Sequence, residues 1–218
     1  MSDAHEQATH VLVRVWLPDR PGALGLVASR IGAVDGDIVG IDVLERGDNV
    51  AVDEFAVLLR KEIALDLLVR EIEEVDGASV EQVRTIDHFP DPRLDALASA
   101  TALCAADSID GLHRTLVEHI QVEFTADWSA LLRDATLLAS AGDATPDASV
   151  LEALVTGTAA SPRVADGTTG PDDLAVASLP DHGAALLMGR DGSAFRRRER
   201  AQLNALAGIA DRTWALLN

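Results

Sequence analysis

The chain has 218 residues, enough for one large domain or two small ones. Hydrophobic residues make up 48% and aromatic residues only 3%, so a core must be built mainly from Ala, Val, Leu and Ile. The formal net charge of −18 gives an acidic surface that repels phosphate groups, which argues against nucleic acid or a membrane as a partner.

Cysteine content and the start of the chain indicate the compartment. Cys104 is the only cysteine, so no disulfide can form within the chain, and its Ala/Leu-rich surroundings predict a small buried side chain. The first residues lack the basic start and apolar run of a secretory signal. No apolar stretch approaches the ~20 residues of a membrane span. We therefore expect a cytoplasmic protein.

The first half of the chain alternates between strand and helix patterns. Residues 1–9 are polar and predict a disordered tail. The next six elements are a strand over 10–17, a helix from Pro21 to a stop at 35–36, strands over 37–45 and 50–60, a helix from Leu65 to Val75, and a strand over 80–86. Residues 46–49 predict a hairpin turn between the middle strands.

This β-α-β-β-α-β order predicts a ferredoxin-like α+β fold over residues 10–87. Two helices would bury their apolar stripes on one face of a four-stranded antiparallel sheet. The other face and at least one sheet edge would stay uncovered, which predicts pairing with a second copy of the chain.

Residues 88–93 contain two prolines and predict a linker before a second domain over 94–218. That half is again mixed α/β. It is predicted to contain helices over 94–106 and 109–124, a strand pair or one long strand over 126–139, a short helix over 150–156, a loop over 157–173, strands over 174–179 and 183–189, and a helix over 195–217.

Residues 19–25 (Asp-Arg-Pro-Gly-Ala-Leu-Gly) lie between the first strand and the first helix. In this frame they resemble the signature of the ACT domain family, and residues 36–38 (Gly-Asp-Ile) resemble the family's step into the second strand. The resemblance covers about residues 11–86. It implies a regulatory domain that pairs side by side and binds an amino acid at the interface of a homodimer.

The resemblance also implies a ligand site made by two copies. One copy would offer Leu17 and Asp19 in the loop, and the other would offer Asp37 and Ile38. Serine-responsive members carry His, Asn, Asn and Ile there, so three of the four positions differ and serine is not implied. With the loop included, the predicted ligand-binding residues are Leu17, Asp19, Arg20, Pro21, Gly22, Ala23, Leu24, Asp37 and Ile38.

Elementary chemistry supports a site for a zwitterion. The N–H groups of Gly22, Ala23 and Leu24 begin a helix without intrahelical partners, which suits a ligand carboxylate. Asp19 and Asp37 could accept hydrogen bonds from a ligand ammonium. The alternative is that Asp19 only caps the helix and Asp37 only starts a strand.

The second half resembles a GAF domain through its order of elements, residues 183–189 and residues 195–203. Such a domain is an α/β structure with a central antiparallel sheet that binds a small molecule or only dimerises. No chromophore cysteine lies in the usual region, and the Asn-Lys-Phe-Asp-Glu motif of cyclic-nucleotide binders is missing. The basic cluster at residues 196–200 predicts a solvated first helical turn rather than a phosphate contact.

No nucleophile, base and orienting group can be assembled from the sequence, so we expect no catalytic residues, no metal and no cofactor. The favoured hypothesis is a non-catalytic sensor that binds an amino acid or similar small molecule and signals to a separate effector protein. The alternatives are a ligand-free dimerisation scaffold, or an enzyme with an unrecognised pocket in the second half.

Overall fold

The structure is a computed structural model that describes residues 8–60, 63–160 and 170–218. The chain forms two compact units that divide between Pro90 and Asp91. Residues 1–7 of the predicted tail lie outside the described residues. Its last two residues, Ala8 and Thr9, instead begin the first strand, because they pair with the end of the third.

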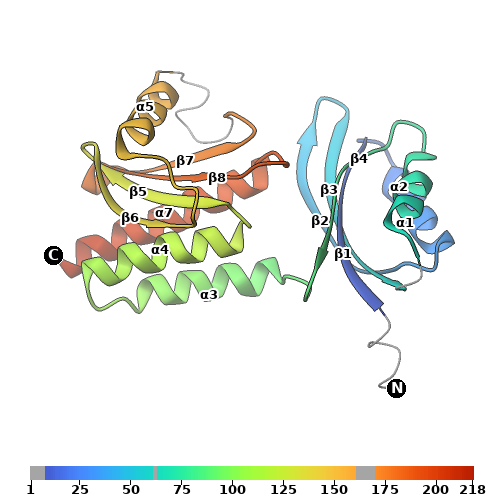
Figure 1. Ribbon diagram of the computed structural model, residues 1–218, viewed down its shortest axis with the longest axis horizontal. Helices are drawn as coiled ribbons and strands as arrows, with labels where there is room; N and C mark the ends of the chain where they lie inside the picture. Colours follow the sequence, from blue (N-terminus) through green and yellow to red (C-terminus); the bar gives the residue numbers. More distant parts are fainter. Residues whose placement is uncertain (1–7, 61–62, 161–169) are drawn as a thin grey trace. The chain divides into compact units, whose positions relative to one another are not determined.

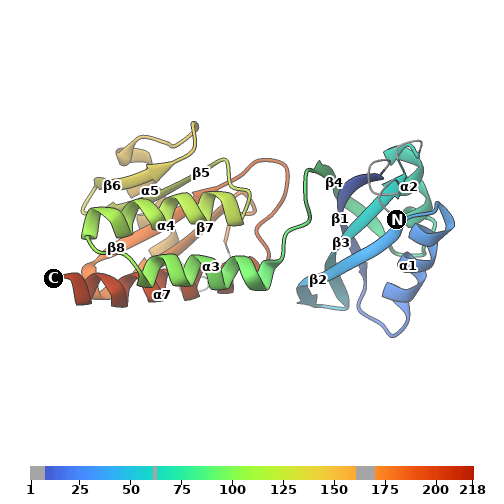
Figure 2. The same ribbon diagram turned by 90° about the horizontal axis from the view of Figure 1, so that it is seen from below.

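The N-terminal unit confirms the predicted β-α-β-β-α-β order. Its elements are β1 (Ala8–Pro18), α1 (Ala23–Ala33), β2 (Asp37–Gly47), β3 (Val50–Arg60), α2 (Leu65–Glu73) and β4 (Ser79–Ile86). The four strands are antiparallel in the order β2-β3-β1-β4. Both helices cover the same face of the sheet (Figures 1 and 2). This is the ferredoxin-like arrangement, with β2 and β4 at the edges.

Apolar residues at alternate positions of β1 form the face of the strand that the helices cover. Val11, Val13 and Val15 are fully buried and belong to the cluster that contains Ile31 of α1 and Ile72 of α2. Each such side chain stabilises the unit by about 1.5–3 kcal/mol relative to an exposed position. The odd-numbered residues of β1 therefore face the core, as their spacing predicts.

The C-terminal unit is also mixed α and β. Its elements are α3 (Pro92–Cys104), α4 (Ile109–Glu123), β5 (Trp128–Arg133), β6 (Thr136–Ala141), α5 (Ala148–Ala159), β7 (Leu174–Leu179), the 3-10 turn η1 (Pro180–His182), β8 (Ala184–Gly189) and α7 (Arg197–Leu217). The sheet is antiparallel in the order β6-β5-β8-β7. A central antiparallel sheet was predicted for this half.

Helices cover both faces of this second sheet. Figure 1 shows α3, α4 and α7 on one face and α5 on the other. The larger core lies under the three helices and includes Leu116, Leu186 and Leu203. A smaller core, with Leu132 and Leu151, lies under α5. Consecutive residues of β8 therefore pack into different cores, and all six residues of that strand are buried.

Of the two alternatives for residues 126–139, the strand pair is right and the single strand is wrong. Asp134 and Ala135 both have positive φ, 49° and 57°, and join β5 to β6 as a two-residue hairpin turn. The turn is hard to recognise in the sequence, because its two residues are Asp-Ala rather than the usual Asn-Gly or Asp-Gly. The helix predicted over 150–156 is α5, which is longer because Gly157 fits inside it.

The predicted linker ends earlier than expected. Asp91 caps α3, its carboxylate accepting from the N–H groups of Arg93 and Leu94 at 3.1 Å. Pro92 is the first helical residue, where the missing N–H does no harm. Residues 92 and 93 are therefore helical, and the predicted linker is confined to the residues before them.

Two predicted environments are wrong. Cys104 is exposed at the end of α3, because the buried side of that helix is formed by Ser99 and Leu103. Arg200 is buried rather than solvated, and its guanidinium donates to the carbonyl oxygens of Phe195 and Pro171. Arg196 in the same cluster is likewise buried, at 8% exposure.

Within the described ranges, no helix is long and apolar enough to cross a membrane.

Candidate functional site

The loop between β1 and α1 is built by Pro18 and two glycines. Gly22 adopts φ 89° just before α1, a left-handed conformation that favours glycine. Gly77 also has positive φ, and a Cβ there would lie 2.8 Å from Pro18, so the turn after α2 packs closely on the loop. Arg20 and Pro21 are exposed at the tip. The loop is therefore a tight turn whose outer residues face solvent.

The resemblance to the ACT family implies that Leu17 contacts the ligand, but the structure places its side chain elsewhere. Its side chain is 3% exposed and belongs to the core under the helices. An alternating strand that puts Val11, Val13 and Val15 in the core puts the odd-numbered Leu17 there as well. The Leu17 side chain therefore stabilises the unit and is not placed to touch a ligand.

Asp19 is held by an arginine from the end of β2. Arg46 donates to Asp19 Oδ1 through Nε at 3.1 Å and Nη2 at 2.5 Å. This charged hydrogen bond raises the pKa of Arg46. The Arg46 side chain is 65% exposed, and the Asp19 backbone N–H donates to Asn49 O in the β2–β3 turn. Asp19 therefore joins two loops at one end of the sheet and does not cap α1 with its side chain.

The start of α1 carries the three backbone N–H groups that were predicted to bind a ligand carboxylate. The Ala23 N–H donates to Arg20 O at 3.3 Å, so one of the three predicted donors has a partner inside the loop. Gly22 has no heavy atom within 4 Å of the position of an added Cβ, which leaves open space beside it. The Leu24 side chain is 36% exposed.

Asp37 and Ile38 lie at the other end of the sheet. In the strand register Asp37 pairs with Leu58 of β3, whereas Leu17 pairs with Ala51 of the same strand. Seven residues at about 3.3 Å each separate these rows by roughly 23 Å. The loop and the start of β2 therefore cannot share one small ligand within a single copy.

Asp53 is a charged residue that the sequence analysis missed. It lies on the helix-covered face of β3, opposite Val15 of β1, and is only 2% exposed. Its Oδ1 is buried without a hydrogen-bond partner. Burial raises the pKa of Asp53, opposed by the positive charge of Arg46 and reinforced by the negative charge of Asp19. The only sign of its burial in the sequence is that Asp53 shares the odd-numbered alternation of Ala51, Phe55 and Val57.

We expect Asp53→Asn to stabilise the protein near pH 7 by about 1 kcal/mol, because burying the charge costs free energy that Arg46 only partly offsets. Because the carboxyl pKa is raised, the folded state keeps a proton that the unfolded state has lost at pH values between the two pKa values. The free energy of unfolding of the wild type therefore falls as pH rises from the ordinary value near 3.8 through the raised pKa. The advantage of the variant should vanish below about pH 4.

Urea unfolding between pH 3.5 and 8 measures this difference. Asp87→Asn, which removes an exposed carboxylate after β4, is the control and should show no such pH dependence. An equal stability difference at every pH would show that the charge of Asp53 is not the cause.

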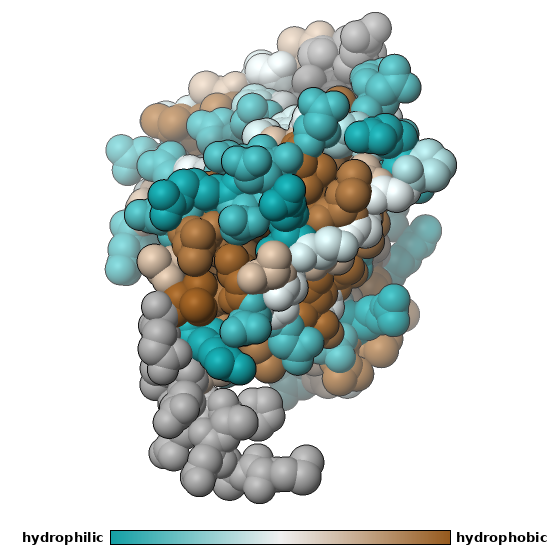
Figure 3. Space-filling model, turned by 90° about the vertical axis from the view of Figure 1, so that its right-hand side faces the viewer, coloured by the Kyte–Doolittle hydropathy of each residue, from teal (hydrophilic) through white to brown (hydrophobic). Residues whose placement is uncertain are grey.

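The edge strand β2 exposes an apolar strip. Val39, Ile41 and Val43 are 47%, 38% and 42% exposed, and on the neighbouring helix α1 Leu26 is 49% exposed. Figure 3 shows hydrophobic residues gathered on the face of the N-terminal unit that it views. Edge strands of soluble monomers more often carry charges at such positions. We call Val39, Ile41 and Val43 the β2 strip.

The C-terminal unit contains a Ser–His–Glu cluster between helices. The buried Ser99 hydroxyl of α3 donates to Glu123 Oε2 at 2.5 Å and contacts His119 Nδ1 at 3.1 Å. Gln202 of α7 donates to the other Glu123 oxygen. Burial raises the pKa of Glu123, which these hydrogen bonds oppose. These contacts join side chains of α3, α4 and α7, so the cluster holds three helices together.

A second histidine contacts an acid near the end of α7. His182 Nδ1 lies 2.7 Å from Asp211 Oδ1, and its ring stacks on Trp214 with centroids 4.2 Å apart. Asp211 Oδ2 also accepts from the Asp181 N–H at 3.0 Å, which anchors η1 to α7. The pair thus positions a turn. Among the described residues, no group of three or more His, Cys, Asp and Glu side chains is arranged to hold a metal ion.

No protein-family model and no curated protein matches the chain. Similar solved structures include the C-terminal domain of the MgtC protein from Mycobacterium tuberculosis, at 20% identity over 39% of this chain and 95% of that chain, with a TM-score of 0.33. They also include the ACT domain of GTP pyrophosphokinase from Chlorobium tepidum, at 18% identity over 36% of this chain and 99% of that chain, with a TM-score of 0.29.

A further similar structure is an unknown protein from Galdieria sulphuraria, at 13% identity over 94% of this chain and 92% of that chain, with a TM-score of 0.34. At such TM-scores, the fold of the N-terminal unit is assigned from its own strand order and connections.

Proposed function

We propose that the N-terminal unit is a regulatory module of the ACT type that binds a small zwitterion, such as an amino acid, between two copies of the chain. The observation that carries the proposal is the position of the two predicted half-sites. They lie at opposite ends of the sheet, and the edge strand β2, with its exposed apolar strip, runs from one end to the other.

Pairing of β2 with β2 of a second copy would join the half-sites. In an antiparallel pair related by a two-fold axis, the start of each strand lies beside the end of the other. The start carries Asp37, and the end carries Arg46, which is bound to Asp19. One two-fold contact would therefore create two equivalent sites while covering the β2 strip.

The charges at these ends suit a zwitterion. The exposed Arg46 guanidinium has donors to spare beyond Asp19 and would bind a ligand carboxylate. The exposed Asp37 of the second copy would accept from the ligand ammonium. This assignment gives Arg46 the role that the sequence analysis assigned to the helix N–H groups alone.

Regulation requires the ligand to bind one dimer geometry better than another. In this proposal the protein is a non-catalytic homodimer in the cytoplasm, and the C-terminal unit acts as a GAF-like module that contacts a separate effector protein. The β2 strip alone would also serve a ligand-free scaffold, so a test must separate ligand binding from association.

A thermal-shift screen of the full chain against the twenty amino acids tests the ligand. A true ligand at 100 times its Kd should stabilise the protein by about 2.7 kcal/mol. Arg46→Gln and Asp37→Asn should each weaken binding at least about tenfold, because each removes one charged contact. Arg114→Gln, at an exposed position on α4, is the matched control and should leave affinity unchanged.

An intact dimer that no amino acid stabilises would favour the scaffold and contradict the proposed ligand class. Stabilisation that persists in both Arg46→Gln and Asp37→Asn would place the ligand elsewhere in the chain.

A further inference from the structure

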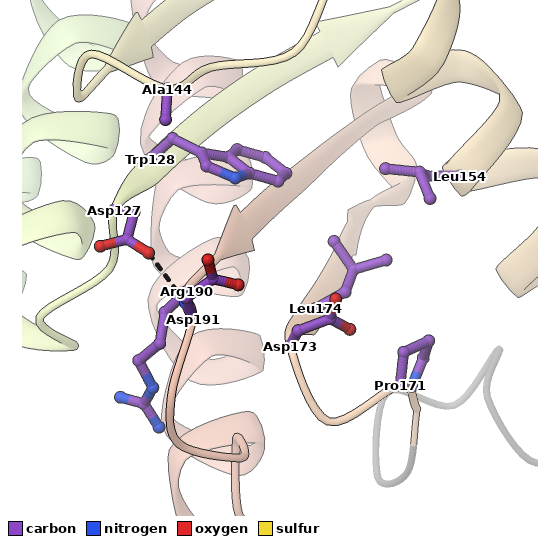
Figure 4. Close-up of a pocket in the computed structure, with 9 residues that line it drawn as sticks. All are labelled: Asp127, Trp128, Ala144, Leu154, Pro171, Asp173, Leu174, Arg190 and Asp191. Atoms are coloured by element: carbon purple, nitrogen blue, oxygen red, sulfur yellow. Dashed lines mark hydrogen bonds between the residues drawn. The ribbon is translucent and has the colours of Figure 1, made fainter.

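The C-terminal unit contains a cavity of about 250 Å³ on the side of the sheet that α5 covers. Trp128 at the start of β5, Leu154 of α5 and Leu174 at the start of β7 contribute its apolar walls. Figure 4 shows the indole ring on one side of the space and the two leucine side chains on the other. The volume is just below the usual range for ligand pockets, so a small molecule would fit.

The indole of Trp128 has a defined place because Gly189 lies directly beneath it. Trp128 and Gly189 are register partners in β5 and β8. A Cβ on Gly189 would lie 2.4 Å from two indole atoms, so only glycine lets the ring lie this close to the backbone. One indole face is therefore covered by β8, and the ring is held at the wall of the cavity.

Three carboxylates surround the same space. Asp127, Asp173 and Asp191 all line the cavity. The Asp191 N–H donates to Asp127 Oδ2 at 2.8 Å, which fixes the segment before β5 against the one after β8 (Figure 4). The carboxylates of Asp173 and Asp191 have no hydrogen bond or ion pair with another residue in the part of the chain that the structure describes. The described part of the lining is thus strongly negative.

Arg190 is the one cationic residue among the described residues of the lining, and it does not offset this charge. Its guanidinium donates to Phe124 O at 2.7 Å and to Glu199 Oε1 at 2.8 Å, and it lies over the Phe195 ring. Figure 4 shows the Arg190 side chain pointing away from the indole of Trp128. Its positive charge is therefore neutralised by Glu199 outside the cavity.

We propose that this cavity binds a small organic cation, an alkylated ammonium compound with a short apolar body. An aromatic face attracts a weakly hydrated cation, and the surrounding carboxylates add a favourable potential. The leucine walls accept the alkyl groups, which inorganic cations lack. The site lies wholly within the C-terminal unit, so it is independent of the zwitterion site proposed for the N-terminal unit.

Choline and its neutral carbon isostere, 3,3-dimethylbutan-1-ol, test the proposal on the full chain. The protein has three tryptophans, so an amide-correlation NMR spectrum shows three indole N–H signals, and Trp128→Phe identifies one of them. Choline should shift the Trp128 signal saturably. The neutral isostere and sodium chloride at equal ionic strength should not.

Variants separate charge from shape. Asp173→Asn with Asp191→Asn should weaken choline binding at least about tenfold, because two nearby negative charges are lost. Glu118→Gln with Asp134→Asn removes the same charge at exposed positions of this unit that do not line the cavity, and should change affinity less than about twofold. Equal shifts with choline and the neutral isostere, or unchanged affinity in the first double variant, would overturn the proposal.

Discussion

Replacing Gly142 with Ala is expected to destabilise the C-terminal unit by about 3 kcal/mol, through backbone strain and a clash that no side chain can relieve. Gly142 follows β6 with φ 90°. A Cβ there would lie 2.1 Å from the carbonyl oxygen of Asp127 and 2.8 Å from Cα of Trp128. Both are backbone atoms, so the chain before β5 would have to move.

Gly157→Ala is the matched control for this substitution. Gly157 lies inside α5, and a Cβ there meets no atom within 4 Å. Alanine is the better helix former, so this variant should be more stable by about 0.5–1 kcal/mol. Urea unfolding, monitored by hydrogen exchange of amides in the C-terminal unit, measures both changes. A Gly142→Ala variant as stable as the wild type would show that this backbone contact is not close in solution.

Replacing Val43 with Glu is expected to raise the dissociation constant of the proposed dimer at least about a hundredfold. Val43 is the last residue of the β2 strip, lies near the middle of β2 and is 42% exposed in one copy. Two-fold pairing through β2 would bury two copies of the new charge close together, which costs several kcal/mol. The fold should survive, because Val43 is outside the buried core of the unit.

Sedimentation velocity over a range of concentrations checks this expectation. Val122→Glu makes the same change on α4, where the valine is 74% exposed, and should leave the dimer intact. A monomeric wild type at tens of micromolar, or a Val43→Glu variant that dimerises as tightly as the wild type, would rule out β2 as the interface.

The proposed zwitterion site shows how much of a site local sequence patterns can predict. The loop at residues 19–22, the start of β2 and their place between elements follow from turn residues and apolar spacing. The ion pair of Asp19 with Arg46 does not, because the two residues are 27 positions apart in sequence and meet only through the pairing of β1, β2 and β3. The same is true of Leu17, whose burial depends on which face the helices cover.

The C-terminal unit shows the same limit more strongly. Its strands were located from short apolar runs, and β7 was predicted over its full length. The cavity was not foreseen, because Trp128, Leu154 and Leu174 come from three separate elements and converge only in the sheet order β6-β5-β8-β7. Gly189 gave no local signal either, since its close contact with the Trp128 indole is made across strands.

The sequence by itself determined the order and type of most elements, the core face of β1 and the acidic character of the chain. These properties depend on residues that are neighbours along the chain, and their periodicity is visible in a window of about ten to twenty residues. The tertiary structure alone decided which charges are paired, which are buried and where a cavity is left. Those outcomes depend on contacts between distant segments, such as Asp53 beside Val15 of β1 and Trp128 on Gly189, and local periodicity does not encode them.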